Sequence, residues 1–291
     1  MIYDLSGAQI DSAYVLNGNH ALEAFNLQGS KIHGNETTLR VMTYNVGAWY
    51  TGITTPIPTA QKAKYSALQN GIFTRANADI CLMQEYLKDF CQDGTLASDF
   101  LEPYFNSIDT TNETQGYRGH AICAKGYAVS NYQTHLFSNA GNTNYQGYET
   151  ATINVNGKTI NLINTHNNWQ TAPQAIHMAE VLEAIKGMEY FILCGDFNID
   201  MQTEDKTDAQ YIQSVKVLLD RGYNMANFND ERGWMKTYYG AAEATGGKFC
   251  DNIITSSNIE VISAYADEAK LTDDIADKID HLPIIATLAI R

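Results

Sequence analysis

Phe191-Ile192-Leu193-Cys194-Gly195-Asp196-Phe197-Asn198 is the stretch of this 291-residue chain that decides its fold. Its apolar residues predict a buried strand, which stops at a glycine and delivers an aspartate and an asparagine to a loop. Three other apolar runs end in the same way, at Asn45, Glu85 and His166. We therefore expect several strands to place polar groups at one rim of the fold.

Length and composition limit the class of protein. With 291 residues and 44% hydrophobic content, the chain can bury a large core, which excludes a disordered protein. No apolar run approaches the ~20 residues that cross a bilayer, and the first residues lack the features of an export signal, so we expect a cytoplasmic protein without a transmembrane segment. The five cysteines are odd in number and include no CxxC pair, which favours a reduced protein without a structural zinc site.

The formal charge of −14 argues against a broad basic face that follows duplex phosphates. The basic residues best placed to meet a phosphate are few, namely Arg118, Arg232, Lys236 and Lys248. The negative charge does not exclude a nuclease, because several of the carboxylates would lie in a metal site, where a bound cation attracts phosphate.

Residues 1–36 differ from the rest of the chain. Glycines recur at Gly7, Gly18 and Gly29, a spacing of 11 residues, and predict a short Gly-turn repeat that forms a small β-rich N-terminal segment. Two interpretations of residues 1–32 are open: they bind a protein partner, or they are a packing extension. Residues 37–291 form the main domain.

Strand-like and helical patterns alternate along the main domain. Apolar spacing predicts helices over residues 61–76, 173–186 and 208–221. Strands are expected over residues 121–124, 134–137, 151–155, 159–164, 249–254, 260–265 and 282–290. Asn156-Gly157 supplies the positive φ angles of a type I′ hairpin turn. Helices together with antiparallel hairpins indicate an α/β (α+β) fold of two packed sheets flanked by helices.

The polar residues at or near the strand ends suggest one kind of chemistry. Oxygen ligands hold Mg²⁺ or Mn²⁺, and two histidines can handle phosphate and protons, so together they suit phosphoester hydrolysis. The residues concerned are Asn45, Glu85, His166, Asp196, Asn198, Asp251, Asp280 and His281.

Residues 38–291 resemble the endonuclease/exonuclease/phosphatase superfamily, which includes deoxyribonuclease I-like nucleases, neutral sphingomyelinases and inositol polyphosphate 5-phosphatases. Six short motifs in the family's order carry the resemblance: Thr43-Tyr44-Asn45, Gln84-Glu85, Asn164-Thr165-His166, Gly195-Asp196-Phe197-Asn198, Asp251-Asn252-Ile253-Ile254 and Asp280-His281. The resemblance implies a four-layered α/β/β/α sandwich of two mixed sheets and a divalent-metal-dependent phosphoester hydrolase.

The resemblance also implies roles for single residues. Glu85 would be the principal ligand of Mg²⁺ or Mn²⁺, helped by Asn45 and Asp280. Asp196 would orient or deprotonate the attacking water, and Asn198 would donate a hydrogen bond to a phosphoryl oxygen.

The two histidines complete this implied mechanism. His281 would contact the scissile phosphate as an imidazolium supported by Asp251 or Asp280, and His166 would bind the phosphate from the other side. Water would then attack in line, without a covalent intermediate.

The leading interpretation is a nuclease-like phosphodiesterase with a nucleic acid substrate. The alternatives are a phosphatase or phospholipid phosphodiesterase of the same superfamily, or a non-catalytic scaffold that binds through the N-terminal repeats. Thr150, Asn167-Asn168 and Asn252 depart from residues that are common in the family, so we expect substrate contacts to differ from those of its best-known members.

Several aromatic and histidine residues remain open or are interpreted as structural. Trp49, Trp169 and Trp234 either line the rim, where they would stack on a nucleobase or seat against lipid, or pack loops onto the core. His177 and Glu180 are predicted to lie on a helix surface, since no HExxH zinc motif is present. The other histidines are interpreted as structural: His20, His33, His120 and His135.

Overall fold

The computed structural model describes residues 37–50, 55–110, 119–138, 147–169, 171–199, 216–229, 233–239, 249–268 and 279–291. The repeat predicted for residues 1–32 lies outside these ranges, as does most of the helix predicted over 208–221. No helix in the described ranges is long and apolar enough to cross a membrane.

The first sheet has six strands in the order β13-β14-β1-β2-β4-β3. β1 and β2 run parallel, and the other neighbours are antiparallel. The strands are β1 (Thr37–Asn45), β2 (Ile80–Gln84), β3 (Ser107–Thr110), β4 (His120–Ala124), β13 (Ile259–Ala266) and β14 (Ile284–Ile290).

The second sheet also has six strands, in the order β5-β6-β7-β8-β12-β9, and its parallel pair is β7 and β8. Its strands are β5 (Ser130–Leu136), β6 (Gly147–Val155), β7 (Lys158–His166), β8 (Phe191–Asp196), β9 (Asn224–Met225) and β12 (Asp251–Thr255). A separate ribbon pairs β10 (Phe228–Asn229) with β11 (Gly233–Trp234). Asn156 and Gly157 have φ angles of 50° and 84°, which confirms the predicted β6–β7 turn.

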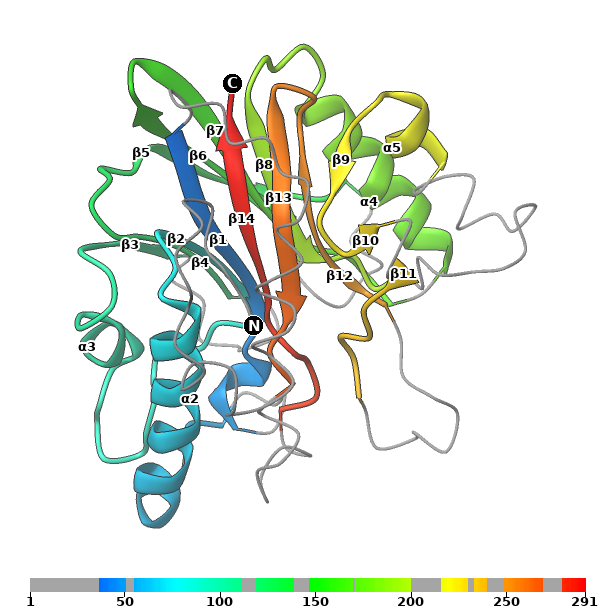
Figure 1. Ribbon diagram of the computed structural model, residues 1–291. Coiled ribbons are helices and arrows are strands. Elements are labelled where there is room, and N and C mark those ends of the chain that lie inside the picture. Colours follow the sequence, from blue (N-terminus) through cyan, green and yellow to red (C-terminus); the bar gives the residue numbers. More distant parts are fainter. Residues whose placement is uncertain are drawn as a thin grey trace, which may run out of the picture. The chain divides into compact units, whose positions relative to one another are not determined.

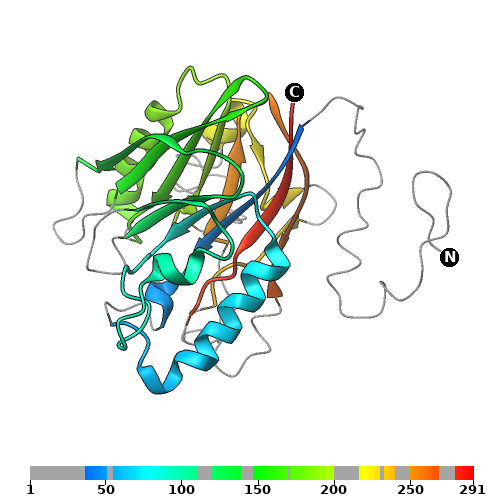
Figure 2. The same ribbon diagram turned by 90° about the vertical axis from the view of Figure 1, so that its left-hand side faces the viewer.

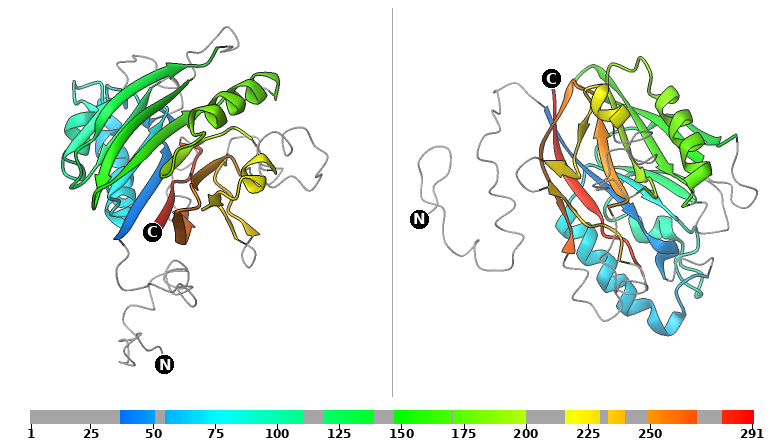
Figure 3. Two further views of the ribbon diagram at one scale, coloured as in Figure 1. Left: turned by 90° about the horizontal axis from the view of Figure 1, so that it is seen from above. Right: turned by 90° about the vertical axis from the view of Figure 1, so that its right-hand side faces the viewer.

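Helices cover the outer side of each sheet (Figure 1). They are α2 (Lys62–Ala76), α3 (Ala97–Leu101), α4 (Thr171–Ala184) and α5 (Val217–Asp220), with short 3₁₀ turns η2 (Gly47–Trp49) and η3 (Thr59–Gln61). Figure 2 shows α2 (cyan) along the sheet that contains β1 and β14. Figure 3 shows α4 (green) beside the strands of the second sheet.

Strand alternation produces three apolar layers, as β2 illustrates. Ile80 and Leu82 point between the two sheets, whereas Cys81 and Met83 point towards α2. On the far side, the outward residues of the second sheet pack on α4. The predicted four-layered α/β/β/α sandwich is therefore confirmed. All five cysteines are free and buried.

Gly195 lets β7 and β8 approach closely just before the polar ends of both strands. A Cβ at this position would lie 2.0 Å from the backbone oxygen of Thr165 on the neighbouring strand. Because that oxygen cannot move without breaking the parallel ladder, the position requires glycine.

Gly195→Ala is expected to destabilise the fold by about 1–3 kcal/mol or more through overpacking, measured as a lower urea midpoint at an unchanged slope. Gly71→Ala in α2 is the matched control, because its Cβ would meet only the flexible end of Arg75. The control should be neutral or stabilising, by up to about 1 kcal/mol. Equal midpoints for Gly195→Ala and wild type would contradict the close-approach argument.

Candidate active site

Two parallel strand pairs bring polar residues from both sheets to one rim. In the first sheet Asn45 is in register with Gln84, the residue before Glu85. In the second sheet His166 is in register with Asp196. The carboxyl ends of neighbouring parallel strands lie at the same edge, so the apolar runs singled out in the sequence all stop at this rim.

Asp196 lies at the centre of the cluster. Its Oδ2 atom is 3.1 Å from Nδ2 of Asn45, 3.4 Å from Nε2 of His281 and 3.5 Å from Nε2 of His166. Its Oδ1 atom accepts a 2.8 Å hydrogen bond from the backbone N–H of Asn198. One buried carboxylate thus joins groups from both sheets.

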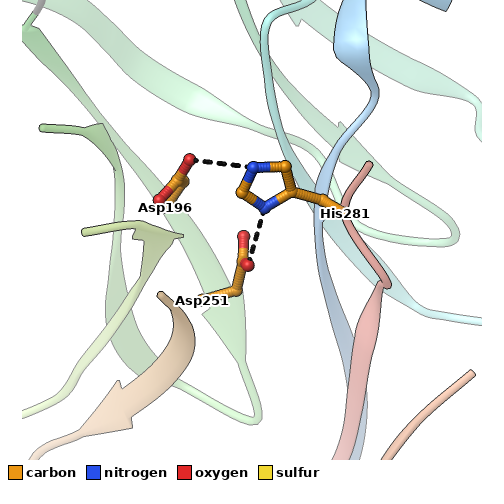
Figure 4. Close-up of side chains that lie close together, drawn as sticks. All are labelled: Asp196, Asp251 and His281. Atoms are coloured by element: carbon orange, nitrogen blue, oxygen red, sulfur yellow. Dashed lines mark hydrogen bonds and ion pairs between the residues drawn. The ribbon is translucent and has the colours of Figure 1, made fainter. Parts of the chain in front are cut away.

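His281 is held between two aspartates (Figure 4). Its Nδ1 atom lies 2.8 Å from Oδ2 of Asp251, while Nε2 faces Asp196. Asp251 is fully buried and is fixed through its backbone N–H, which donates to Oγ1 of Thr237 at 3.1 Å. Burial disfavours the charged imidazole, but the Asp251 and Asp196 carboxylates outweigh it and raise the pKa of His281 well above its ordinary value. At neutral pH this arrangement holds a cationic imidazolium.

The surroundings of Glu85 disfavour the ionised form of its carboxyl group. Its side chain is 17% exposed, and burial raises its pKa to about 7; repulsion from Asp280 and Asp196 adds to the effect, whereas attraction to His281 opposes it. Its φ angle of 52° is left-handed, a conformation that costs a non-glycine residue about 1–2 kcal/mol. Strain and crowded carboxylates at one point are features of sites that receive a cation.

Asn45 and Asp280 flank this carboxylate differently. The Asn45 amide donates from Nδ2 to Glu85 at 3.2 Å, and its Oδ1 accepts the backbone N–H of Gly47 at 3.0 Å. The amide nitrogen therefore faces the carboxylates, and Asn45 would have to turn to offer its oxygen to a metal. Asp280 is half-buried, and its backbone oxygen accepts the N–H of Tyr239 at 2.7 Å.

A hydrogen bond between side chains joins the two sheets behind the rim. Gln84 Nε2 on β2 donates to Oδ1 of Asn164 on β7 at 2.6 Å, and Nδ2 of Asn164 donates back to the Met83 backbone oxygen at 2.7 Å. Sequence reasoning quoted both residues within motifs but gave them no role. The available signal was a polar residue inside each apolar run.

A second buried polar pair lies beside His166. His120 Nδ1 is 3.1 Å from Oε1 of Glu149, and the ring of His120 meets that of His166 edge to face at 6.3 Å between centroids. Sequence reasoning interpreted His120 only as structural. Its position under His166 adds a role in packing against the site.

The loop after His166 is fixed from several sides. The backbone N–H of Asn167 donates to the Asp196 backbone oxygen at 2.9 Å, and the backbone oxygen of Asn167 accepts a hydrogen bond from Nδ2 of Asn198 at 2.8 Å. The N–H of Asn168 donates to Nδ1 of His177 on α4 at 3.2 Å. His177 is fully buried, so its predicted place on a helix surface is wrong. Its ring stacks on a phenylalanine and anchors the loop.

The three tryptophans have different environments. Trp49 is fully buried, and its Nε1 donates to the Leu87 backbone oxygen at 2.7 Å, so the core-packing interpretation holds for it. Trp234 is half-buried against Phe228, with ring centroids 4.9 Å apart. Trp169 is exposed. Of the basic residues considered for phosphate contact, Lys236 is exposed and the other three lie outside the described ranges.

The link between the sheets can be tested with a double-mutant cycle. Gln84→Ala and Asn164→Ala should each destabilise the fold by about 1–3 kcal/mol, because each leaves a buried polar partner unsatisfied. The double variant should reveal a coupling energy of about 0.5–3 kcal/mol in urea unfolding.

The matched control is the exposed pair Asn131 and Thr152, whose side chains form a 3.0 Å hydrogen bond between β5 and β6. Its coupling should be a few tenths of a kcal/mol, since solvent replaces the bond. Strict additivity for the Gln84 and Asn164 variants would show that their hydrogen bond does not hold the sheets together.

No protein-family model matches the sequence, and no curated protein matches it. Several solved structures do match this chain. An endonuclease/exonuclease/phosphatase from Beutenbergia cavernae matches with a TM-score of 0.63 at 15% identity, over 87% of this chain and 72% of its own. D. rerio TDP2, complexed with single strand DNA product, matches with a TM-score of 0.63 at 15% identity, over 87% of this chain and 99% of its own.

A third structure is ANGEL2, a 2′,3′-cyclic phosphatase, in complex with adenosine-2′,3′-vanadate. It matches with a TM-score of 0.58 at 13% identity, over 88% of this chain and 96% of its own. At these identities the likeness concerns the fold, and it extends over nearly all of the main domain. The chain therefore has the fold of the endonuclease/exonuclease/phosphatase superfamily, as the six sequence motifs indicated.

Proposed function

We propose that this protein is a divalent-metal-dependent phosphoester hydrolase, and specifically a nuclease-like phosphodiesterase. The observation that carries the proposal is the imidazole of His281 held between the carboxylates of Asp251 and Asp196. An imidazole held in its cationic form beside a carboxylate and a second histidine, His166, is suited to a phosphate whose negative charge grows during reaction.

The residues near Glu85 fit a divalent cation. The raised pKa of Glu85 reflects burial and neighbouring carboxylates, which a cation would relieve. Glu85 and Asp280 would hold the ion, joined by Asn45 if its amide turns. When bound, Mg²⁺ or Mn²⁺ would supply positive charge that polarises the phosphoryl group.

The protein's own groups would handle the water and the phosphate. Asp196 accepts hydrogen bonds and can take a proton from water, whose oxygen then attacks phosphorus in line with the ester oxygen that leaves. Asn198 and the two histidines would donate hydrogen bonds to phosphoryl oxygens. The P–O ester bond breaks, and the departing oxygen takes up a proton from solvent or from a histidine.

The comparisons support a nucleotide-containing substrate. TDP2 from D. rerio is complexed with single strand DNA product, and ANGEL2 is bound to adenosine-2′,3′-vanadate. We therefore place DNA or RNA phosphodiesters ahead of phosphoinositides and phospholipids. A partner-binding role for residues 1–32 remains a prediction from their repeat.

The first test is cleavage of supercoiled plasmid and of a single-stranded oligonucleotide with Mg²⁺ or Mn²⁺. His281→Ala should lower the rate at least ~10²-fold, because it removes the charge that faces the phosphate. His135→Ala is the matched control and should retain activity, since His135 lies on β5 and stacks on Tyr148. EDTA should abolish cleavage by every variant.

Metal binding is measured separately by thermal unfolding. Mg²⁺ or Mn²⁺ should raise the Tm of wild type in a concentration-dependent manner, and Glu85→Gln should weaken this response. A wild-type protein that shows neither cleavage nor a metal-dependent Tm would contradict the proposal and favour a non-catalytic scaffold.

A further inference from the structure

We infer that Trp169 is a stacking surface for a nucleobase next to the scissile phosphate, so that the site selects phosphodiesters that carry a base. This inference rests on the proposed function and deepens it, because it names a specificity-determining residue. Neither the proposed chemistry nor the metal site requires Trp169.

The exposure of Trp169 is the first observation. Its side chain is 69% exposed, whereas Trp49 is fully buried and Trp234 is half-buried. Leaving the large apolar ring of a tryptophan in water costs more free energy than leaving most other side chains exposed. The exposed indole lies only three residues after His166, on the loop that follows the end of β7 at the rim.

The rigidity of its loop is the second observation. The two residues between His166 and Trp169 are buried, and hydrogen bonds tie them to the backbone of Asp196, the amide of Asn198 and the ring of His177. The backbone that carries Trp169 is thus fixed before substrate arrives. A loop backbone that is already ordered loses little conformational entropy when its side chain stacks on a ligand, which favours a binding function.

Charge is the third observation. The chain has a formal charge of −14, and the Asn45 amide brings the carboxylates of Glu85 and Asp196 together at the site. Long-range attraction of a polyanion is therefore weak, and affinity must depend more on contacts that do not need positive charge. Base–aromatic stacking is such a contact, and it accounts for about 5- to 150-fold in affinity per base.

A lipid surface is the competing occupant, and the same charge argues against it. Membrane docking combines several exposed apolar side chains with basic residues. The other large exposed hydrophobic residues in the described ranges are Leu136 at the end of β5 and Leu219 on α5. They do not belong to the Trp169 loop, which offers a single ring.

The test compares two short single-stranded oligonucleotides, each with one cleavable phosphate. In the first, the two nucleotides that flank this phosphate carry bases; in the second, the same two positions are abasic. Steady-state kcat and KM are measured with Mg²⁺ or Mn²⁺ for wild type, Trp169→Ala and Trp169→Phe. Wild type should show a KM about 5- to 150-fold lower for the base-bearing substrate. Trp169→Ala should lose that preference while its kcat on the abasic substrate stays unchanged, and Trp169→Phe should keep most of it.

The outcomes separate this inference from the proposed function. If wild type cleaves both substrates with equal KM, or if Trp169→Ala keeps the preference, the stacking role is wrong and the hydrolase proposal stands. If wild type cleaves neither, the stacking role is wrong, and the plasmid and metal-dependent Tm experiments decide the hydrolase proposal. Unchanged KM values together with weaker binding of Trp169→Ala to phosphatidylcholine vesicles would overturn the inference in favour of a lipid contact.

Discussion

The hydrogen bond from Gln84 to Asn164 is the interaction on which the arrangement of the site depends. It crosses from β2 to β7 at 2.6 Å, in the buried space between the sheets. Gln84 directly precedes Glu85, and Asn164 lies two residues before His166. This bond therefore fixes the distance between a carboxylate of one sheet and a histidine of the other, which a purely apolar interface would specify less well.

Much of this architecture could be predicted because it is local in the sequence. An apolar run that stops at a polar residue marks both a strand and its end, as it does at Asn45 and Asp196. Asn156-Gly157 specifies its own turn through positive φ. The order of such signals along the chain predicted two packed sheets flanked by helices, and the family resemblance added that the sheets are mixed and form four layers. The polar residues at the strand ends predicted a shared rim.

The remaining features depend on contacts between distant segments. His177 was placed on the helix surface because no HExxH motif accompanies it, but its Nδ1 accepts the N–H of Asn168 in the loop after β7 and its ring stacks on Phe137 at 3.9 Å. The buried pair of His120 and Glu149 likewise joins β4 to β6, at separate positions in the chain. The left-handed backbone of Glu85 had no sequence signal at all, because its side chain is not of a type that favours that conformation.

Neither sheet contains the site alone. The first sheet and its connections contribute Asn45, Glu85 and His281, and the second contributes His166, Asp196 and Asp251. Asp196 interacts with residues of the first sheet through a single oxygen, within 3.4 Å of both Asn45 and His281. A small shift of one sheet relative to the other would separate these groups. It would leave the buried His281 imidazolium and several buried carboxylates unpaired, at a large cost in free energy. The charges that would perform the reaction thus also penalise any other register of the two sheets, provided that the hydrogen bond between Gln84 and Asn164 first aligns them.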